Sequence, residues 1–315
     1  MRTTRRFSAL FAAGVTGAVA LAVAIPVAPV VTPAALRAQP APRAEVPVLL
    51  LPDAVFDGTT DALQPGWAVL VTGQRISAVG PANTLTVPAN ARRVPLPGTT
   101  LLPGLSDLHS HVLLHPYDET PWNDQVLRES LALRTARAVN HLKATLDAGF
   151  TMLRDLGTEG AGYADVGLKE AVDQGIIPGP RLFVTTKAIV ATGSYGPKGF
   201  GAEIGVPQGA EEADGVEGVT RVVRDQIGHG ADWIKIYADY RWGPRGEARP
   251  TFTHEEWRAI VATASSSGRP VVAHASTVEG ITRAVMAGAE VIEHGDAATP
   301  EVFSLMKQKG VAFCP

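Results

Sequence analysis

The chain has 315 residues and a formal net charge of −3, with 28 Lys and Arg against 31 Asp and Glu. This balance provides no strong field for nucleic acid or an anionic membrane, and 45% hydrophobic with 19% charged residues exclude wholesale disorder. Cys314 is the one cysteine, which excludes an intrachain disulfide and a cysteine-based zinc site. A metal site would therefore use His, Asp, Glu or a less usual ligand.

Residues 1–38 are predicted to be a secretory signal peptide. Three arginines among the first six residues precede an apolar run from Phe7 to Val31, and small residues follow. A retained membrane anchor is the alternative, but Pro26 and Pro29 interrupt the run. We therefore expect a periplasmic or secreted protein without a stable membrane anchor.

Residues 39–100 are predicted to form short β-structure. Val48–Leu51, Trp67–Val71 and Arg75–Val79 are apolar and rich in β-branched residues. The segment Thr72–Gln74 between the last two runs is typical of a hairpin turn. Nothing in this segment indicates catalysis.

Residues 101–315 alternate between strand-like and helix-like runs. Repeated βα units indicate a parallel sheet, and their number indicates an α/β fold of the (β/α)₈ barrel type. The last expected strand ends beside Pro315, so the barrel is expected to lack its eighth strand. The strand candidates are Leu105–His111, Phe150–Arg154, Leu182–Thr186, Asp232–Ala238, Pro270–His274, Glu290–His294 and Val311–Cys314.

Three helices between these strands have recognisable ends. Apolar residues from Leu127 to Leu146 lie on one helical face, and Gly149 is expected to end that helix. Thr253 and Glu256 fit a capping box. The segment from Thr277 to Gly288 is expected to be a helix that ends at its glycine.

The most specific motif is Asp107-Leu108-His109-Ser110-His111. Alternate side chains of a strand share a face, so His109 and His111 point the same way, with Asp107 beneath them. Two imidazoles at this spacing can bind one metal ion. A polar pair on a solvated edge is the alternative, but the apolar run Leu101–Leu105 leads into a buried strand.

Lys235 is the second candidate. Ile234 and Ile236 are expected to face the helices, which places Lys235 and Tyr237 inside the barrel. A buried lysine without a partner is rare, and beside two divalent cations its pKa should fall. The neutral amine can react with carbon dioxide to give a carbamate that bridges two metal ions. A structural salt bridge, for example to Asp107, is an equally weighted alternative.

His274 and His294 end two consecutive strand candidates, one βα unit apart. They should therefore occupy the same end of adjacent strands. Each alone would more often be a hydrogen-bonded core histidine. Together with His109, His111 and Lys235 at one barrel mouth, they favour a metal site.

The run from Leu102 to His111, together with Lys235 and the two later histidines, resembles the metal-dependent amidohydrolase superfamily, most closely its imidazolonepropionase-like and prolidase-like branch. The resemblance implies that residues 39–100 are the N-terminal part of a small β-sandwich and that residues 101–315 are the hydrolase barrel. It implies one metal ion on His109 and His111, a second on His274 and His294, and carboxylated Lys235 bridging both. Zinc is the metal that this family usually supplies.

The implied reaction is hydrolysis of a carbon–nitrogen bond in an amide, cyclic amide or dipeptide by a hydroxide that bridges the two metal ions. Lys235 and Tyr237 are the candidate catalytic residues. Tyr237 is also a candidate substrate-binding residue, although packing inside the barrel is an equal alternative. Tyr195 stands where prolidase-like members often carry a substrate-facing histidine, so it is the second substrate-binding candidate. The family's metal-binding aspartate of the eighth strand has no counterpart in this sequence.

Two further hypotheses remain open at this point. A mononuclear deaminase or imidazolone hydrolase on the same scaffold would not use a carboxylated lysine, so metal stoichiometry distinguishes it. A truncated, non-catalytic remnant is the other. The expected partner is a small amide or dipeptide substrate rather than nucleic acid, and the sequence leaves a homo-oligomer open.

Overall fold

The computed structural model describes residues 46–315. The predicted signal peptide lies outside the described residues and stays a prediction. By its internal contacts the chain forms two compact units, the larger of which contains residues 97–315. No helix among the described residues is both long enough and apolar enough to cross a membrane.

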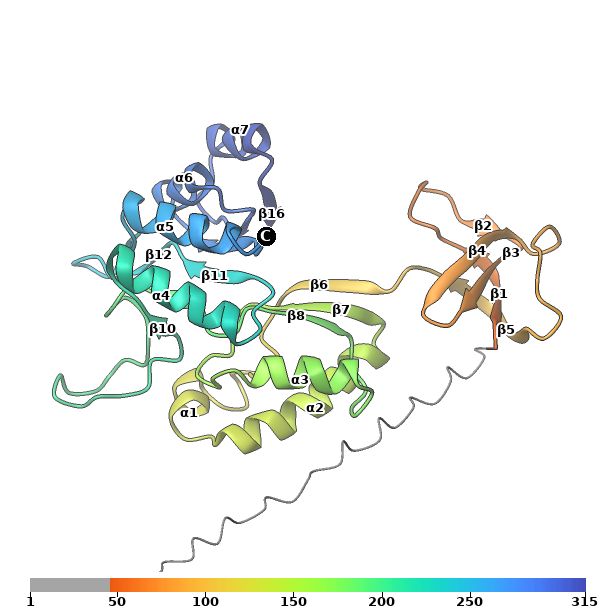
Figure 1. The fold of residues 1–315 in the computed structure, drawn as a ribbon, viewed down its shortest axis with the longest axis horizontal. Helices are drawn as coiled ribbons and strands as arrows, with labels where there is room; N and C mark the ends of the chain where they lie inside the picture. The colour runs from red at the N-terminus through yellow and green to blue at the C-terminus, as the bar shows by residue number, and fades with distance from the viewer. Residues whose placement is uncertain (1–45) are drawn as a thin grey trace, which may run out of the picture. The chain divides into compact units, whose positions relative to one another are not determined.

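The N-terminal strands form a five-stranded sheet (Figure 1), in which β1 pairs antiparallel with β2 and β3, and β3 pairs antiparallel with β4. Gly73 and Gln74 form the predicted turn, and the φ of Gly73 is +59°, as a tight hairpin requires. Leu49, Ala68 and Leu70 are the buried core of this sheet. The strands are β1 Val48–Val55, β2 Gln64–Pro65, β3 Trp67–Thr72, β4 Arg75–Pro81 and β5 Arg92–Leu101.

The later strands confirm all seven predicted strands of the barrel region. They lie in two parallel sheets, one ordered β6-β7-β8 and the other β10-β9-β11-β14-β15-β16. Asp232 and Trp233 donate backbone hydrogen bonds to Val184 at 2.9 and 3.2 Å, which joins the end of β8 to the start of β11. Within residues 46–315 the strands do not form a closed hydrogen-bonded ring.

The strands of the first sheet are β6 Leu105–Ser110, β7 Phe150–Asp155 and β8 Arg181–Val184. Those of the second are β9 Ile189–Val190, β10 Glu211–Glu212, β11 Ile234–Tyr237, β14 Val271–Ala275, β15 Val291–His294 and β16 Ala312–Cys314. A short antiparallel pair, β12 Asp239–Arg241 and β13 Ala248–Pro250, follows β11.

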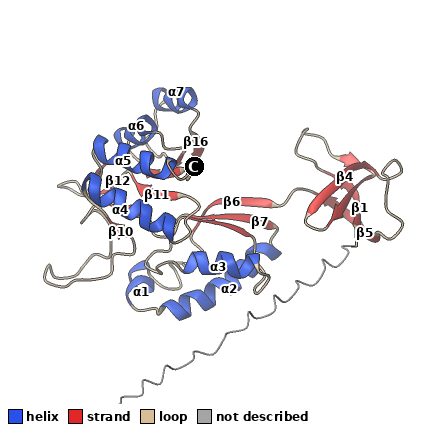
Figure 2. Ribbon diagram, in the orientation of Figure 1, coloured by secondary structure: helices blue, strands red, loops and turns tan. Residues whose placement is uncertain are grey.

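The helices follow one another along the outside of these strands (Figure 2). They are α1 Trp122–Leu127, α2 Leu131–Asp147, α3 Ala164–Asp173, α4 Gly215–Gly228, α5 His254–Ser265, α6 Val278–Ala287 and α7 Pro300–Lys309. The predicted capping box of Thr253 and Glu256 is confirmed at the start of α5. Thr277 caps α6, which ends at left-handed Gly288 as predicted.

One helix boundary was predicted wrongly. The apolar pattern extended a single helix back to Leu127, but the chain forms two helices, because Ser130 accepts a hydrogen bond from the backbone N–H of Leu133 and caps α2 there. A single capping serine between two helices does not interrupt the spacing of the apolar residues, so the apolar pattern alone does not reveal the boundary.

The alternation of β11 separates the outer core from the inner face of the strands. Ile234 and Ile236 are fully buried in one cluster with residues of α4 and α5, such as Val222 and Ile260. Val272 of β14 and Val291 of β15 belong to a different, inner cluster. Lys235 pairs in register with Val272 and therefore lies on that inner face.

Candidate active site

The structure brings the four predicted histidines together at the carboxyl ends of β6, β14 and β15. The ring centroids of His109 and His111 are 5.4 Å apart, those of His109 and His294 are 4.7 Å apart, and those of His274 and His294 are 4.9 Å apart. Parallel strands place their carboxyl ends at one edge of the sheet, which is why residues far apart in sequence meet here.

His294 reaches this cluster through an unusual backbone conformation. In register His274 lies beside Glu293, so a regular strand would turn the His294 side chain to the opposite face. The φ of His294 is +69°, a left-handed conformation that costs a non-glycine residue about 1 kcal/mol or more. The strand ends at this residue, and its imidazole lies beside His109 instead of in the outer layer.

Glu293 orients the first imidazole. His109 Nδ1 lies 2.8 Å from Glu293 Oε2, and Arg154 donates to Glu293 Oε1 at 2.6 Å. Glu293 is fully buried. Burial opposes its ionisation, but the hydrogen bond with His109 and the charges of Lys235 and Arg154 lower its pKa overall. Burial is also the main cause that lowers the pKa of His109.

The second imidazole is held by the backbone. His111 Nδ1 lies 2.9 Å from the carbonyl oxygen of Gly157. A carbonyl can only accept, so Nδ1 carries the proton and Nε2 keeps its lone pair. A ring N–H bound to a carbonyl or carboxylate is the usual support of a metal-ligating histidine.

Lys235 is 1% exposed, and its Nζ has no hydrogen-bond partner among the described residues. Burial, with a smaller contribution from the charge of Arg154, lowers its pKa from the ordinary 10.5 to about 8, although Glu293 acts in the opposite direction. The alternative salt bridge is not formed, because Asp107 Oδ1 instead accepts from the backbone N–H of His109 at 3.0 Å. An unpartnered buried amine is costly unless something else is bound there.

The histidines of the cluster are in the protonation state that binds divalent metal ions. Burial, and then the charge of Lys235, lowers the pKa of His274 to about 2, and the same two causes lower the pKa of His294. Neutral imidazoles are the form that binds metal. No three His, Cys, Asp or Glu side chains among residues 46–315 converge closely enough to form a ready-made metal site, so the rings are neighbours without a finished coordination geometry.

Tyr237 and Tyr195 extend the cluster on one side. Tyr237 stacks on His274 with ring centroids 4.6 Å apart, and Tyr195 lies 4.9 Å from Tyr237. Both tyrosines are 8% exposed. The hydroxyl of Tyr195 donates to Glu159 Oε2 at 2.6 Å. These two tyrosines are therefore both packed in the interior and close to the histidine cluster.

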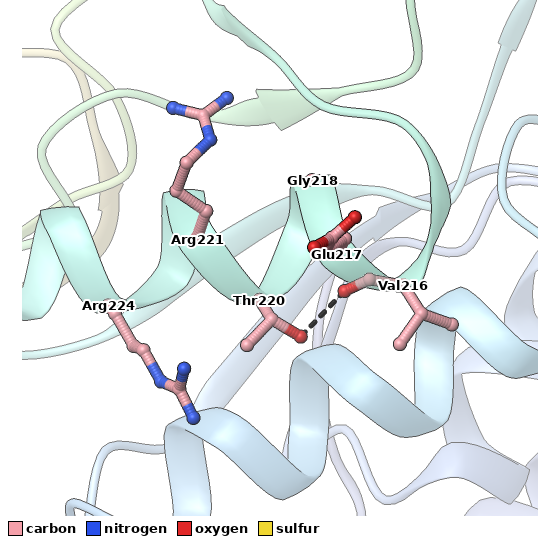
Figure 3. A pocket seen from close by; sticks show the side chains of 6 residues that line it. All are labelled: Val216, Glu217, Gly218, Thr220, Arg221 and Arg224. Atoms are coloured by element: carbon pink, nitrogen blue, oxygen red, sulfur yellow. Dashed lines mark hydrogen bonds between the residues drawn. The ribbon is translucent and has the colours of Figure 1, made fainter.

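Two of the surface hollows in the larger unit bear on the choice of site. One, of about 330 Å³, is lined by His111, Leu114, His115, Pro116 and Tyr117, and so opens beside the histidine cluster. The other, of about 790 Å³, follows one face of α4 (Figure 3) and contains none of the predicted site residues. Of these two hollows, only the one beside His111 is lined by a predicted site residue.

Comparison with protein families matches residues 100–313 to the amidohydrolase family. The chain belongs to this family. The matched segment contains every histidine and lysine of the candidate site.

Three relatives of this amidohydrolase illustrate the family. An ochratoxinase of Aspergillus niger is 32% identical over 271 residues, covering 78% of this chain and 54% of the relative. The crystal structure of a prolidase complexed with N-methylphosphonate-L-proline has a TM-score of 0.75 and 32% identity, over 86% of this chain and 66% of that chain. A Xaa-Pro dipeptidase with bound methionine in the active site has a TM-score of 0.74 and 28% identity, over 85% and 66%.

This amidohydrolase thus spans about half the length of the curated relatives that it matches. Its solved relatives, together with its own parallel strands and outer helices, indicate an α/β fold like a TIM barrel.

Sequence reasoning missed four polar residues around the site of this amidohydrolase. Glu293 could have been found, because it alternates with Val291 and so shares the inner face of β15. Arg154, a charged residue at the end of a buried strand, carried a similar signal. Asp239, whose Oδ1 lies 3.9 Å from His274 Nε2, begins the short strand β12. Glu159 lies in the irregular segment after β7, and neither residue gave a sequence pattern.

Proposed function

We propose that this amidohydrolase hydrolyses a carbon–nitrogen bond in a small amide, cyclic amide or dipeptide. The observation that carries the proposal is the buried amine of Lys235, which has no hydrogen-bond partner among the described residues, together with four neighbouring imidazoles. Two of its relatives, a prolidase and a Xaa-Pro dipeptidase, support a dipeptide or amide as the substrate class.

In this proposal His109 and His111 would hold one divalent metal ion, His274 and His294 would hold a second, and Lys235, as a carbamate, would supply a further anionic ligand. Zinc is the proposed metal. Bound metal ions supply a hydroxide nucleophile near neutral pH and polarise the scissile carbonyl. The lowered pKa of Lys235 leaves part of the amine neutral near pH 7, and the neutral amine is the form that reacts with carbon dioxide.

The remaining side chains position these groups. Glu293 and the carbonyl of Gly157 hold the rings of His109 and His111 with Nε2 free. Tyr237 packs flat on His274, which limits rotation of that imidazole and places a phenol beside the site. We propose Tyr237 and Tyr195 as the residues that contact substrate.

A mononuclear deaminase on the same scaffold would leave Lys235 without a function. Its buried amine, which has no hydrogen-bond partner among the described residues, therefore favours the two-metal proposal over the mononuclear one.

The test compares the metal-loaded chain with Lys235→Ala and His274→Ala on a panel of N-acyl amino acids and dipeptides. Glu217→Gln, on the exposed face of α4, is the matched control. We expect hydrolysis by the wild type and the control and its loss in both site variants, together with a loss of bound metal. Full activity of Lys235→Ala with unchanged metal content would contradict the carbamate.

We further propose that residues 1–38 direct export to the periplasm or the medium and that residues 39–100 belong to a small β-sandwich. Fractionation of cells that express the chain, with N-terminal sequencing of the exported form, tests the first of these. A mature protein that begins near residue 39 is the expected result, and retention of the intact chain in the cytoplasm would contradict it.

A further inference from the structure

Arg154 is a buried arginine near the end of β7 to which the proposed mechanism gives no role of its own. The residue is 5% exposed. Burying a guanidinium is costly unless the charge is paired and its N–H groups are bonded. Arg154 has three neighbours, from three different parts of the chain, and they show which groups this charge holds in place.

Two of these neighbours hold the guanidinium itself. Arg154 Nε donates to the carbonyl oxygen of Leu108 on β6 at 2.8 Å. The Cζ of Arg154 lies over the ring of Trp233, directly before β11, at 4.8 Å from the ring centroid. A cation at this distance is attracted to the face of an aromatic ring. The guanidinium is therefore fixed from its edge and from one face.

The third neighbour is Glu293, which the guanidinium holds in turn. Arg154 Nη2 donates to Glu293 Oε1 at 2.6 Å, and Glu293 Oε2 lies 2.8 Å from His109 Nδ1. A guanidinium only donates, and its hydrogen bonds to a carboxylate are short and strong. The direction of the carboxylate determines where Oε2 lies. The orientation of the His109 ring therefore depends on Arg154 through Glu293.

This series of contacts crosses from one sheet to the other. Arg154 belongs to the sheet β6-β7-β8, whereas Glu293 lies on β15 of the second sheet, and no strand pairing joins β6 to β15 within residues 46–315. The candidate ligands divide between the sheets in the same way. The first pair, on or directly after β6, is His109 and His111, and the second pair, on β14 and β15, is His274 and His294. A site built from both pairs needs a fixed separation between them.

His111 is held without Arg154. Its Nδ1 lies 2.9 Å from the backbone carbonyl oxygen of Gly157. Loss of the guanidinium should therefore release the ring of His109 and leave the ring of His111 as it is. Because the two ring centroids are only 5.4 Å apart, His111 is an internal control for His109.

We propose that Arg154 is a positioning residue that acts through Glu293 on the ring of His109. In this role it keeps the first pair of ligands at a fixed separation from the second pair. The inference rests on the proposed two-metal hydrolysis, and it names the residue that joins the two halves of that site.

The first test is nitrogen-15 NMR of the histidine rings in the metal-free protein, at a pH at which the rings are neutral. The wild type and the control Arg224→Met, exposed on α4 (Figure 3), should show His109 and His111 with the proton on Nδ1. Arg154→Met should convert His109 to a mixture of tautomers and leave His111 unchanged. An unchanged His109 would overturn the inference. Equal disturbance of both rings would overturn it too, because a merely structural role of Arg154 predicts that result.

The second test measures zinc affinity by competition with a chromogenic chelator. Arg154→Met should weaken binding by about tenfold or more, because the carboxylate that orients His109 is released. Arg154→Lys keeps the charge without the planar fork and should recover part of this loss. The double variant Arg154→Met/Glu293→Gln should stay within about threefold of Glu293→Gln alone, because the arginine acts through the carboxylate. Losses that multiply in the double variant would overturn the inference.

The two tests separate this inference from the proposed function. If the wild type binds no zinc, the two-metal proposal fails, and the NMR signals of His109 and His111 still decide the role of Arg154. If the unpaired carboxylate of Arg154→Met prevents folding, the double variant leaves no unpaired charge, and its zinc affinity relative to Glu293→Gln decides instead.

Discussion

Replacing Lys235 with methionine should stabilise the metal-free protein while destroying its metal site. The side chain of Lys235 is fully buried, and its Nζ has no hydrogen-bond partner among the described residues, although it lies 5.6 Å from the ring centroid of Tyr237. Methionine has a similar length and no charge, so it can occupy the same space without a desolvation cost. We therefore expect this one substitution to have opposite effects on stability and on metal binding.

The magnitude follows from the pKa of Lys235, which falls from 10.5 to about 8 mainly because of burial. Each unit of pKa difference corresponds to about 1.4 kcal/mol, so the protonated lysine costs the native state about 3 kcal/mol near pH 7. The native pKa is lowered, so the unfolded chain binds more protons between about pH 8 and 10.5. Wild-type stability should therefore rise with pH through this window.

Urea unfolding in the presence of a chelator, at several pH values between 7 and 10, measures this effect. Lys235→Met should exceed the wild type by about 3 kcal/mol at pH 7, and the difference should shrink to below about 1 kcal/mol at pH 10. Lys307→Met, on the exposed face of α7, is the matched control and should show no such pH dependence.

A less stable Lys235→Met protein at pH 7 would refute the reasoning, because it would show that the amine has a favourable partner in the metal-free state. A stability difference that does not change with pH would refute it too, since the cost would then not come from the charge.

Three further outcomes are expected. Glu293→Gln should weaken metal binding by about 10- to 100-fold, measured by competition with a chromogenic chelator, because His109 loses its charged partner; unchanged affinity would exclude this role. Burial raises the pKa of Asp165 from 3.8 to about 6, so this carboxyl binds more protons in the native state than in the unfolded chain. The free energy of unfolding should therefore fall by up to about 3 kcal/mol as pH rises from 4 to 6, and Asp165→Asn should flatten this curve. A wild-type curve that is equally flat would contradict this expectation. Trp257→Ala should cost about 3 to 5 kcal/mol in urea unfolding, because the ring is fully buried in the outer core, and a loss below 1 kcal/mol would contradict that packing.

The strands were predictable because their sequence signal is local. β11, β14 and β15 are short apolar runs buried on both faces, and each ends in or contains a polar residue that points inward. Strand alternation was enough to place Lys235 opposite Ile234 and Ile236. The common carboxyl edge of parallel strands was enough to bring His109 and His274 to one place.

The rest of the site depends on tertiary contacts that no local pattern encodes. Glu159 faces the site through a left-handed φ in a loop that Arg134 holds, and neither feature has a spacing rule. His294 also owes its direction to a left-handed φ, where simple alternation would turn it away from Glu293. The pairing of Arg154 with Glu293 joins residues 139 positions apart and becomes visible only in the folded chain.

The central claim is that Lys235 takes part in binding the metal ions as a carbamate. The most direct measurement is carbon-13 NMR of the chain loaded with zinc under labelled carbon dioxide, alongside the metal content of the same sample. We expect about two metal ions per chain and a protein-bound carbamate signal that disappears in Lys235→Met. A full metal content without any lysine-bound label would contradict it.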